Sequence, residues 1–341
     1  MMKVAVIGAG SWGTAVAWLL GEKAYDVTLW AREPEIAEGV NTDGRNPMFL
    51  TDVQLAPGVR ATHEIGEAVQ DATAVVIVTP SHGVRGVAEA MSAHLASSVP
   101  VINLAKGVEQ NTLMRMTQIL EEVLGNRARL AALSGPNHAE EVSRGVPSAT
   151  VVAAYEDQVA RMFQDLFMAP TFRVYTNPDV VGVELCGASK NVVAVAAGMV
   201  DGLGYGDNTK ATLMTRGLAE MSRLGAHLGA NPMTYMGLAG MGDLIVTCTS
   251  RHSRNRALGE WIAGGGTVES YAAETHMVAE GAKSAVSLDD LAAKLEIEMP
   301  ITRQVRAILY EGHVPGEAAG ILMGRTAVDE FHGMGLVEDN E

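Results

Sequence analysis

The sequence predicts an α/β fold in its first half, with a mostly parallel, doubly wound sheet, and a helical second half. Short apolar runs alternate with amphipathic helical patterns up to about residue 175, and strand patterns nearly vanish from residue 183 onward. Strands that are buried on both faces and alternate with helices form parallel sheets. At 341 residues the chain is long enough for about two domains, which we place at residues 1–180 and 181–341.

The first predicted strand, residues 4–7, runs into a Gly8-x-Gly10-x-x-Gly13 turn and then into a helix. Gly8 permits the turn, Gly10 lets the backbone approach a pyrophosphate, and Gly13 lets the helix pack against the strand. The N–H groups and the positive dipole end of that helix then face the diphosphate. A glycine triplet alone is weak evidence, but here a second strand, residues 26–30, follows at the right distance. The sequence therefore predicts a dinucleotide site.

The corner after the second strand bears on the choice of dinucleotide. Dehydrogenases that prefer NAD commonly place an acidic residue there, which holds the ribose 2′-hydroxyl. In this chain Arg32 can pair with a 2′-phosphate and favours NADP, whereas Glu33 leaves NAD open. By position alone, Arg32 is equally well explained as a solvated surface arginine.

Polar or small residues follow several of the later strands. Ligands of doubly wound sheets lie beyond the carboxyl ends of the strands, where we expect Lys106, Gly135 and Asn137. A lysine after a buried strand can also simply face solvent.

Residues 41–57 have little periodicity and are predicted to be irregular. Further strands are predicted at residues 74–78, 99–104, 130–133, 148–154 and 171–175, with helices between them such as 112–124.

In the second half, Lys190 lies in a predicted helix, residues 183–203, that is otherwise almost entirely small and apolar. A buried ammonium is costly without a partner. Burial also lowers the pKa of a lysine toward the range in which it can transfer protons. Lys190 is therefore a candidate for proton transfer. The alternative is a lysine whose stem covers apolar surface while its head stays in water.

Two polar features follow a glycine-rich stretch at residues 237–242. Asp243 comes directly after these glycines, where the backbone can approach a ligand, although a helix N-cap explains it too. Residues 250–256 then combine three arginines with hydroxyl and amide side chains in an otherwise acidic chain. Such donors suit a phosphate dianion, and the position after the glycines favours phosphate binding over a merely solvated charged face.

Composition excludes several classes of partner. The formal charge of −15 argues against nucleic acid and anionic membrane surfaces, which need a basic face. No uninterrupted apolar stretch reaches the roughly 18–20 residues of a membrane span, and we expect no signal peptide and no stable membrane association. Cys186 and Cys248 are expected to be buried thiols in a reducing, cytoplasmic compartment. The nine histidines are scattered, so no metal site and no nucleophile elbow is predicted.

The assembled motifs make the chain resemble the bacterial NAD(P)-dependent glycerol-3-phosphate dehydrogenase family from about residue 3 to about residue 330. The motifs are GAGSWGT at Gly8, NLAKG at Asn103, SGPNHAEE at Ser134, FRVYTNPD at Phe172, GASKNVVAVAAGM at Gly187, TRGLAEMSRLG at Thr215, GLAGMGDLIVTCTS at Gly237 and SRNR at Ser253. The resemblance implies a Rossmann-type N-terminal domain, an all-helical C-terminal domain and a homodimer. It implies reversible hydride transfer between sn-glycerol 3-phosphate and dihydroxyacetone phosphate for glycerophospholipid synthesis.

The resemblance also assigns site residues. Lys190 matches the proton acceptor. The positions that match substrate contacts are Lys106, Gly135, Asn137, Lys190, Asp243, Ser253, Arg254 and Asn255. Those expected to bind NADP or NAD, with NADP favoured, are Gly8, Gly10, Ser11, Trp12, Gly13, Arg32, Lys106, Ala139, Arg254, Val278 and Glu280. One departure is Asn137-His138, where many relatives carry Ser or Thr followed by Phe.

The expected mechanism follows from these positions. Arg254 and Asn255 fix the phosphate, Lys190 is held by Asp243 and exchanges the hydroxyl proton, and Lys106 stabilises charge on the oxygen. Two alternatives stay open. One is another Rossmann-plus-helical dehydrogenase that acts on hydroxy acids or sugar acids. The other is a regulator that senses NADP without chemistry.

Overall fold

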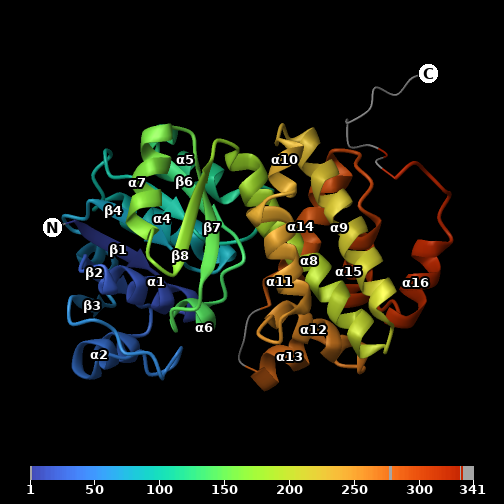
Figure 1. Cartoon of the computed structure of the whole chain (residues 1–341), viewed down its shortest axis with the longest axis horizontal. Coiled ribbons are helices and arrows are strands. Elements are labelled where there is room, and N and C mark those ends of the chain that lie inside the picture. Colours follow the sequence, from blue (N-terminus) through green and yellow to red (C-terminus); the bar gives the residue numbers. More distant parts are fainter. Residues whose placement is uncertain (1, 276–278, 331, 333–341) are drawn as a thin grey trace. The chain divides into compact units, whose positions relative to one another are not determined.

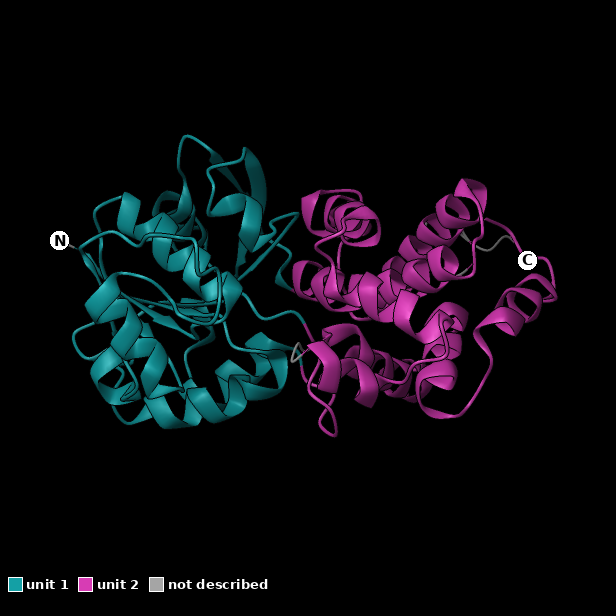
Figure 2. Cartoon of the chain, turned by 90° about the horizontal axis from the view of Figure 1, so that it is seen from below, with its two compact units in different colours: residues 1–106, 115–180 teal, residues 107–114, 181–341 magenta. Residues whose placement is uncertain are grey.

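The computed structural model describes residues 2–275, 279–330 and 332 of the chain. The chain packs as two compact units (Figure 2): residues 1–106 with 115–180, and residues 107–114 with 181–341. The short segment 107–114 joins the second unit because Val108 is buried in its apolar core and Leu113 packs against that core. A division into domains at residue 180 remains a prediction.

The first unit is built on an eight-stranded sheet in the order β3-β2-β1-β4-β5-β6-β7-β8 (Figure 1). Neighbouring strands are parallel except β6 and β7, which confirms the mostly parallel sheet. The sequence did not predict β3, a four-residue strand paired with β2. The strands are β1 Lys3–Ile7, β2 Asp26–Trp30, β3 Val59–Thr62, β4 Ala74–Ile77, β5 Val101–Asn103, β6 Leu130–Ser134, β7 Ser148–Ala154 and β8 Phe172–Asn177.

The helices between these strands differ in two places from the predicted ones. Residues 41–43 were predicted to be irregular but form the end of α2, which stops at Gly44 in the left-handed region. The helix predicted at 112–124 begins only at Met116, because Arg115 is extended and caps it. The helices and 3₁₀ turns are α1 Ser11–Glu22, α2 Pro34–Asp43, α3 Ile65–Val69, η1 Ser81–Gly83, α4 Val84–Ser92, α5 Met116–Leu124, η2 Arg127–Arg129, α6 Ala139–Val142 and α7 Asp157–Phe167.

Among the described residues of the second unit, all regular elements are helical, as predicted (Figure 1). Its long first helix, α8, corresponds to the predicted helix 183–203 but begins and ends slightly earlier. The elements are α8 Val180–Gly202, α9 Asp207–His227, α10 Pro232–Tyr235, the π-helical turn η3 Leu238–Gly242, α11 Asp243–Thr249, α12 Arg254–Ala263, α13 Val268–Thr275, α14 Glu280–Lys294, α15 Pro300–Tyr310 and α16 Pro315–Met323.

Helix α8 is the one helix in the described part of the chain that is long and apolar enough to cross a membrane. Of its most apolar window, 89% is buried inside the protein, as in the core helix of a soluble protein. The sequence showed no uninterrupted apolar run here because Glu184, Lys190 and Asn191 interrupt it, and all three side chains are buried in the fold.

Glycines allow two helices to touch the backbone of α8. A Cβ added at Gly198 would overlap the carbonyl oxygen of Arg256 on α12, and one added at Gly259 would overlap that of Val195. A Cβ at Gly281, in the first turn of α14, would overlap the carbonyl oxygen of Asn191. The first turns of α12 and α14 are therefore held against the middle of α8.

Glu220 of α9 is a buried carboxylate that caps another helix. It accepts hydrogen bonds from the backbone N–H groups of Ile301 (2.6 Å) and Thr302 (3.2 Å) in the first turn of α15. Burial raises its pKa to about 7, although these hydrogen bonds and the charge of Arg223 lower it. The carboxylate thus joins α9 to α15 at the cost of its own desolvation.

We predict that Gly198→Ala destabilises the protein by at least about 2 kcal/mol, because the new methyl group must push α12 away from α8. The measurement is the urea midpoint of the helical unit. Gly320→Ala on α16 is the matched control: its Cβ would meet open space, so alanine should stabilise the helix by up to about 1 kcal/mol. Equal midpoints for the two variants would show that the close approach does not matter.

We predict that Glu220→Gln changes the pH dependence of stability. The folded-state pKa of Glu220, about 7, lies above its ordinary value of 4.5, so the folded state holds the proton more tightly than the unfolded state. The stability that this proton gives is full below about pH 4.5 and is lost as the pH rises through 7. The wild type should therefore lose up to about 3 kcal/mol relative to the variant between pH 5 and pH 8. Glu274→Gln, at an exposed position, keeps Glu220 and should lose stability over this pH range as the wild type does.

Candidate active site

The glycine turn joins β1 to α1 as the pattern predicts. Gly8 has a φ of +121°, in the region that favours glycine, and a Cβ at Gly13 would overlap the carbonyl oxygen of Gly8. A Cβ at Gly10 would meet no heavy atom within 4 Å, so the turn borders open space there. Ser11 and Trp12 form the first turn of α1, whose N-cap, Gly10, offers no side chain to its N–H groups. An uncapped helix N-terminus beside open space fits a diphosphate.

At the carboxyl end of β2, Arg32 forms an ion pair with its neighbour. Its Nε and Nη2 donate to Glu33 Oε1 at 2.9 and 2.7 Å, and the two side chains are 83% and 38% exposed. The guanidinium is thus accessible to a 2′-phosphate, which would have to replace the carboxylate. The carboxylate is less exposed but is still accessible to a ribose hydroxyl.

The residues predicted at the ends of β5 and β6 come together. These strands are parallel neighbours, and Lys106 Nζ donates to the carbonyl oxygen of Gly135 at 3.2 Å. Asn137 Nδ2 donates to Thr150 Oγ1 at 3.0 Å. Ala139 follows as the first residue of the short helix α6. The first unit therefore presents an ammonium, a carboxamide and a helix start at this edge of the sheet.

In the helical unit, Lys190 is buried with Asp243 and Thr247. Its Nζ donates to Asp243 Oδ1 at 2.8 Å and to Thr247 Oγ1 at 2.6 Å, and the Lys190 and Asp243 side chains are only 7% and 3% exposed. Burial excludes the alternative of a lysine head in bulk water. Asp243 is not an N-cap: Gly242 occupies that position, and Asp243 begins α11.

Thr247 was not among the predicted site residues. It lies one helical turn after Asp243 on α11, and its hydroxyl donates to the Asp243 carbonyl oxygen at 2.6 Å. A spacing of four residues places two side chains on the same face of a helix. That spacing could have identified Thr247 once Asp243 was singled out.

The phosphate candidates occupy the start of α12. Ser253 is its N-cap and accepts from the Arg256 N–H at 3.2 Å, while the side chain of Arg254 is exposed. Asn255 is buried, and its Nδ2 donates to Asn191 Oδ1 at 2.9 Å. Its Oδ1 accepts from the Gly281 N–H at 2.8 Å. Asn255 is thus fixed between α8 and α14.

Of the three arginines in residues 250–256, Arg256 is held by the protein itself. It donates to Asp201 Oδ2 at 2.7 Å, to Glu260 Oε1 at 2.8 Å and to the Ser250 carbonyl oxygen at 3.1 Å. These bonds fix the turn that precedes Arg254. The exposed Arg254 is therefore the better candidate for a ligand.

The remaining candidates give a mixed outcome. Glu280, at the first position of α14, lies next to the Gly281 that Asn255 binds, whereas Val278 lies outside the described residues.

Within residues 2–275, 279–330 and 332, no cluster of His, Cys, Asp or Glu could hold a metal ion. Cys186 and Cys248 are buried, and burial raises the pKa of the Cys248 thiol to about 12.

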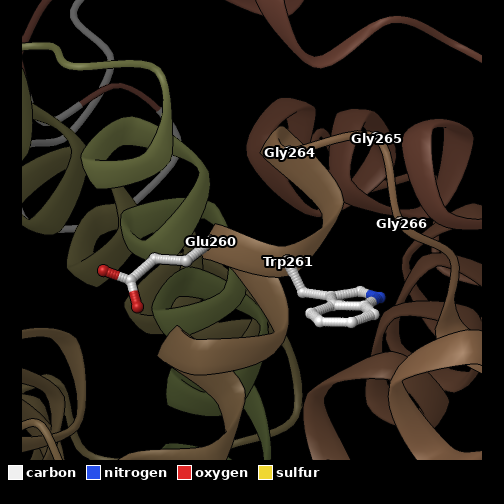
Figure 3. A pocket seen from close by; sticks show the side chains of 5 residues that line it. All are labelled: Glu260, Trp261, Gly264, Gly265 and Gly266. Atoms are coloured by element: carbon white, nitrogen blue, oxygen red, sulfur yellow. The ribbon is translucent and has the colours of Figure 1, made fainter. Parts of the chain in front are cut away.

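A surface depression lies at the far end of α12 from these residues. It is lined by Glu260, Trp261 and Gly264–Gly266, and Figure 3 shows the Glu260 and Trp261 side chains pointing away from each other. The Trp261 indole donates to Ser270 Oγ at 2.9 Å. None of the predicted site residues that the structure describes lines this depression, so it is not the candidate active site.

Comparisons with known proteins place the chain among its relatives. Residues 3–160 match the family model of the NAD-dependent glycerol-3-phosphate dehydrogenase N-terminus, and residues 179–320 match that of the C-terminus. A Moorella thermoacetica protein named glycerol-3-phosphate dehydrogenase (NAD(P)+) is 48% identical over 328 residues, covering 96% of this chain and 97% of that protein. A protein of the same name from Pelotomaculum thermopropionicum is 47% identical over 336 residues, covering 98% and 96%.

Among solved structures, glycerol-3-phosphate dehydrogenase from Coxiella burnetii has a TM-score of 0.91 and 34% identity to this chain. The match covers 95% of this chain and 99% of that one. The two family models thus match both halves of the chain, and the solved structure matches its fold over nearly its full length. The chain belongs to the NAD-dependent glycerol-3-phosphate dehydrogenase family.

Proposed function

We propose that this chain catalyses the reversible, NAD(P)H-dependent reduction of dihydroxyacetone phosphate to sn-glycerol 3-phosphate. Its family and the names of its relatives support the reaction and the use of either dinucleotide. The observation that carries the proposal is the buried Lys190 ammonium, held by Asp243 and Thr247. A protein that only senses NADP has no need of such a costly buried charge.

Lys190 is the proposed proton donor and acceptor. When bound, the nicotinamide ring supplies or accepts the hydride at C2 of the substrate. In reduction, Lys190 Nζ gives a proton to the C2 oxygen, and in oxidation it takes that proton back. Asp243 and Thr247 hold Nζ in one place, so that the amine need not be ordered at the moment of reaction.

The start of α12 is the proposed phosphate site. Arg254 offers an exposed fork of donors, with Ser253 and Asn255 on either side. Because the phosphate is remote from the reacting carbon, its binding energy can orient the C2 oxygen. Lys106, with Gly135 and Asn137 nearby in the first unit, is proposed to contact the substrate and to stabilise negative charge on that oxygen.

The glycine turn is the proposed dinucleotide site. Gly8, Gly10 and Gly13 shape it, and the first turn of α1, with Ser11 and Trp12, offers its N–H groups to the diphosphate. Arg32 supports a preference for NADP, and Glu33 keeps NAD usable. Lys106, Ala139, Arg254, Val278 and Glu280 complete the proposed dinucleotide contacts.

We further propose a role in glycerophospholipid synthesis in the cytoplasm, as a homodimer without stable membrane association. The net charge of −15 supports the absence of nucleic-acid and anionic-membrane partners. The burial of α8 inside the protein supports a soluble enzyme. The homodimer rests on the family alone and is tested by the mass of the protein in solution.

The decisive experiment is reduction of dihydroxyacetone phosphate with NADPH and with NADH, followed at the absorbance band of the reduced nicotinamide. We expect turnover with both, and a higher kcat/KM with NADPH because of Arg32. Turnover confined to 2-oxo acids would indicate a hydroxy-acid dehydrogenase. Binding of NADPH with no turnover of any carbonyl substrate would indicate a regulator.

We predict that Lys190→Ala lowers kcat by about 10²–10⁴-fold, because the C2 oxygen of the substrate loses its proton donor and acceptor. The Kd of NADPH, measured by calorimetry, should stay within about twofold of the wild type. Lys294→Ala, at the exposed end of α14, is the control and should leave both quantities unchanged. Equal losses of kcat and dinucleotide affinity, or no loss of either, would contradict the assignment.

A further inference from the structure

Asn46 is a completely buried asparagine, with none of its surface exposed, in the segment that follows α2. Its Nδ2 donates to the carbonyl oxygen of Ala9 and to Thr14 Oγ1, both at 2.8 Å. Its Oδ1 accepts from the backbone N–H groups of Met48 and Phe49, both at 3.0 Å. A carboxamide has two donor hydrogens and two acceptor lone pairs, so Asn46 uses all of its hydrogen-bonding capacity.

The Ala9 carbonyl belongs to the glycine turn. The described chain contains no cis peptide bond, so the carbonyl of Ala9 and the N–H of Gly10 point in opposite directions within one plane. With the carbonyl fixed toward Asn46, the Gly10 N–H must point away from it. Gly10 is also where a Cβ would meet no heavy atom within 4 Å.

The second bond of Asn46 braces the helix that follows. Thr14 is fully buried in α1, and its N–H donates to the Gly10 carbonyl oxygen at 2.9 Å. One amide group therefore holds the chain on both sides of Gly10, at Ala9 before it and at Thr14 after it. Without this group, the peptide between Ala9 and Gly10 can rotate, since glycine tolerates most backbone conformations.

We propose that Asn46 is a positioning residue for the dinucleotide: it fixes the Ala9–Gly10 peptide so that the Gly10 N–H and the first turn of α1 face the diphosphate. This inference rests on the dinucleotide part of the proposed function and not on the reaction. A purely structural asparagine, which only holds residues 44–50, would instead affect stability without selecting among ligands.

The experiment compares Asn46→Asp with Asn41→Asp. Asn41 offers a control in the same region, because among the described residues its side chain binds the backbone of Ala61, donating at 2.8 Å and accepting at 2.9 Å. Kd values are measured by calorimetry for NADPH, ADP-ribose and adenosine 2′-phosphate, the last of which lacks the diphosphate. Asn46→Ser is measured as well, since it removes the bond to Ala9 without adding a charge.

For both Asn46 variants we expect the Kd of NADPH and ADP-ribose to rise by about 10–100-fold, while that of adenosine 2′-phosphate changes by less than about threefold. Asn41→Asp should leave all three within about threefold. Equal effects of the Asn46 and Asn41 substitutions, or equal loss of all three ligands in the Asn46 variants, would overturn the proposal.

If neither Asn46 variant folds, Thr14→Val provides the test, because it removes one acceptor of the same amide with little change of shape. It should raise the Kd of ADP-ribose by about 3–10-fold, and an unchanged Kd would overturn the proposal. Turnover plays no part in these measurements. Failure to reduce dihydroxyacetone phosphate would therefore refute the proposed reaction but would not test the role of Asn46. The comparison of Kd values decides that role by itself.

Discussion

The burial of the Lys190 ammonium is the constraint on which the helical unit depends. A charge inside an apolar helix is stable only if partners replace water, and here Asp243 and Thr247 supply a carboxylate and a hydroxyl from α11. α11 must therefore lie against the middle of α8, with the glycine-rich turn η3 directly before it. The Thr247 hydroxyl also donates to the Asp243 carbonyl oxygen, which holds both partners on one face of α11.

The same region of α8 orders the phosphate candidates. Gly259 and Gly281 allow α12 and α14 to reach the backbone of α8, and this approach brings Asn255 to Asn191 and to the Gly281 N–H. Lys190 and Asn191 are adjacent, so one turn of α8 fixes both the amine and the amide that positions α12. A shift of α12 along α8 would therefore move Arg254 relative to Lys190.

Local sequence patterns were enough to predict much of this fold. They did not predict which residues far apart in the sequence pair with each other. The glycine turn, the parallel strands and the helical second half were predicted, because spacing and burial leave a mark in short stretches. The contact between Lys190 and Asp243, which are 53 residues apart, was expected only from the family resemblance. β3 and the roles of Asn191 and Asn46 were not predicted. Asn46 binds Ala9 and Asn191 binds Asn255, and such pairings depend on how elements pack and not on any local period.

The two units are suited to bind anions by different physical means. The glycine turn offers backbone N–H groups and a helix dipole, which cost no desolvation of a charged side chain. The start of α12 offers a guanidinium, which suits a compact dianion with two parallel hydrogen bonds. The net charge of −15 does not oppose either site, because exposed charges beyond about 8 Å are screened at physiological ionic strength. We infer that anion binding in this acidic chain depends on the few donors that the fold fixes at contact distance, and that the buried amides of Asn46 and Asn255 help to fix those donors.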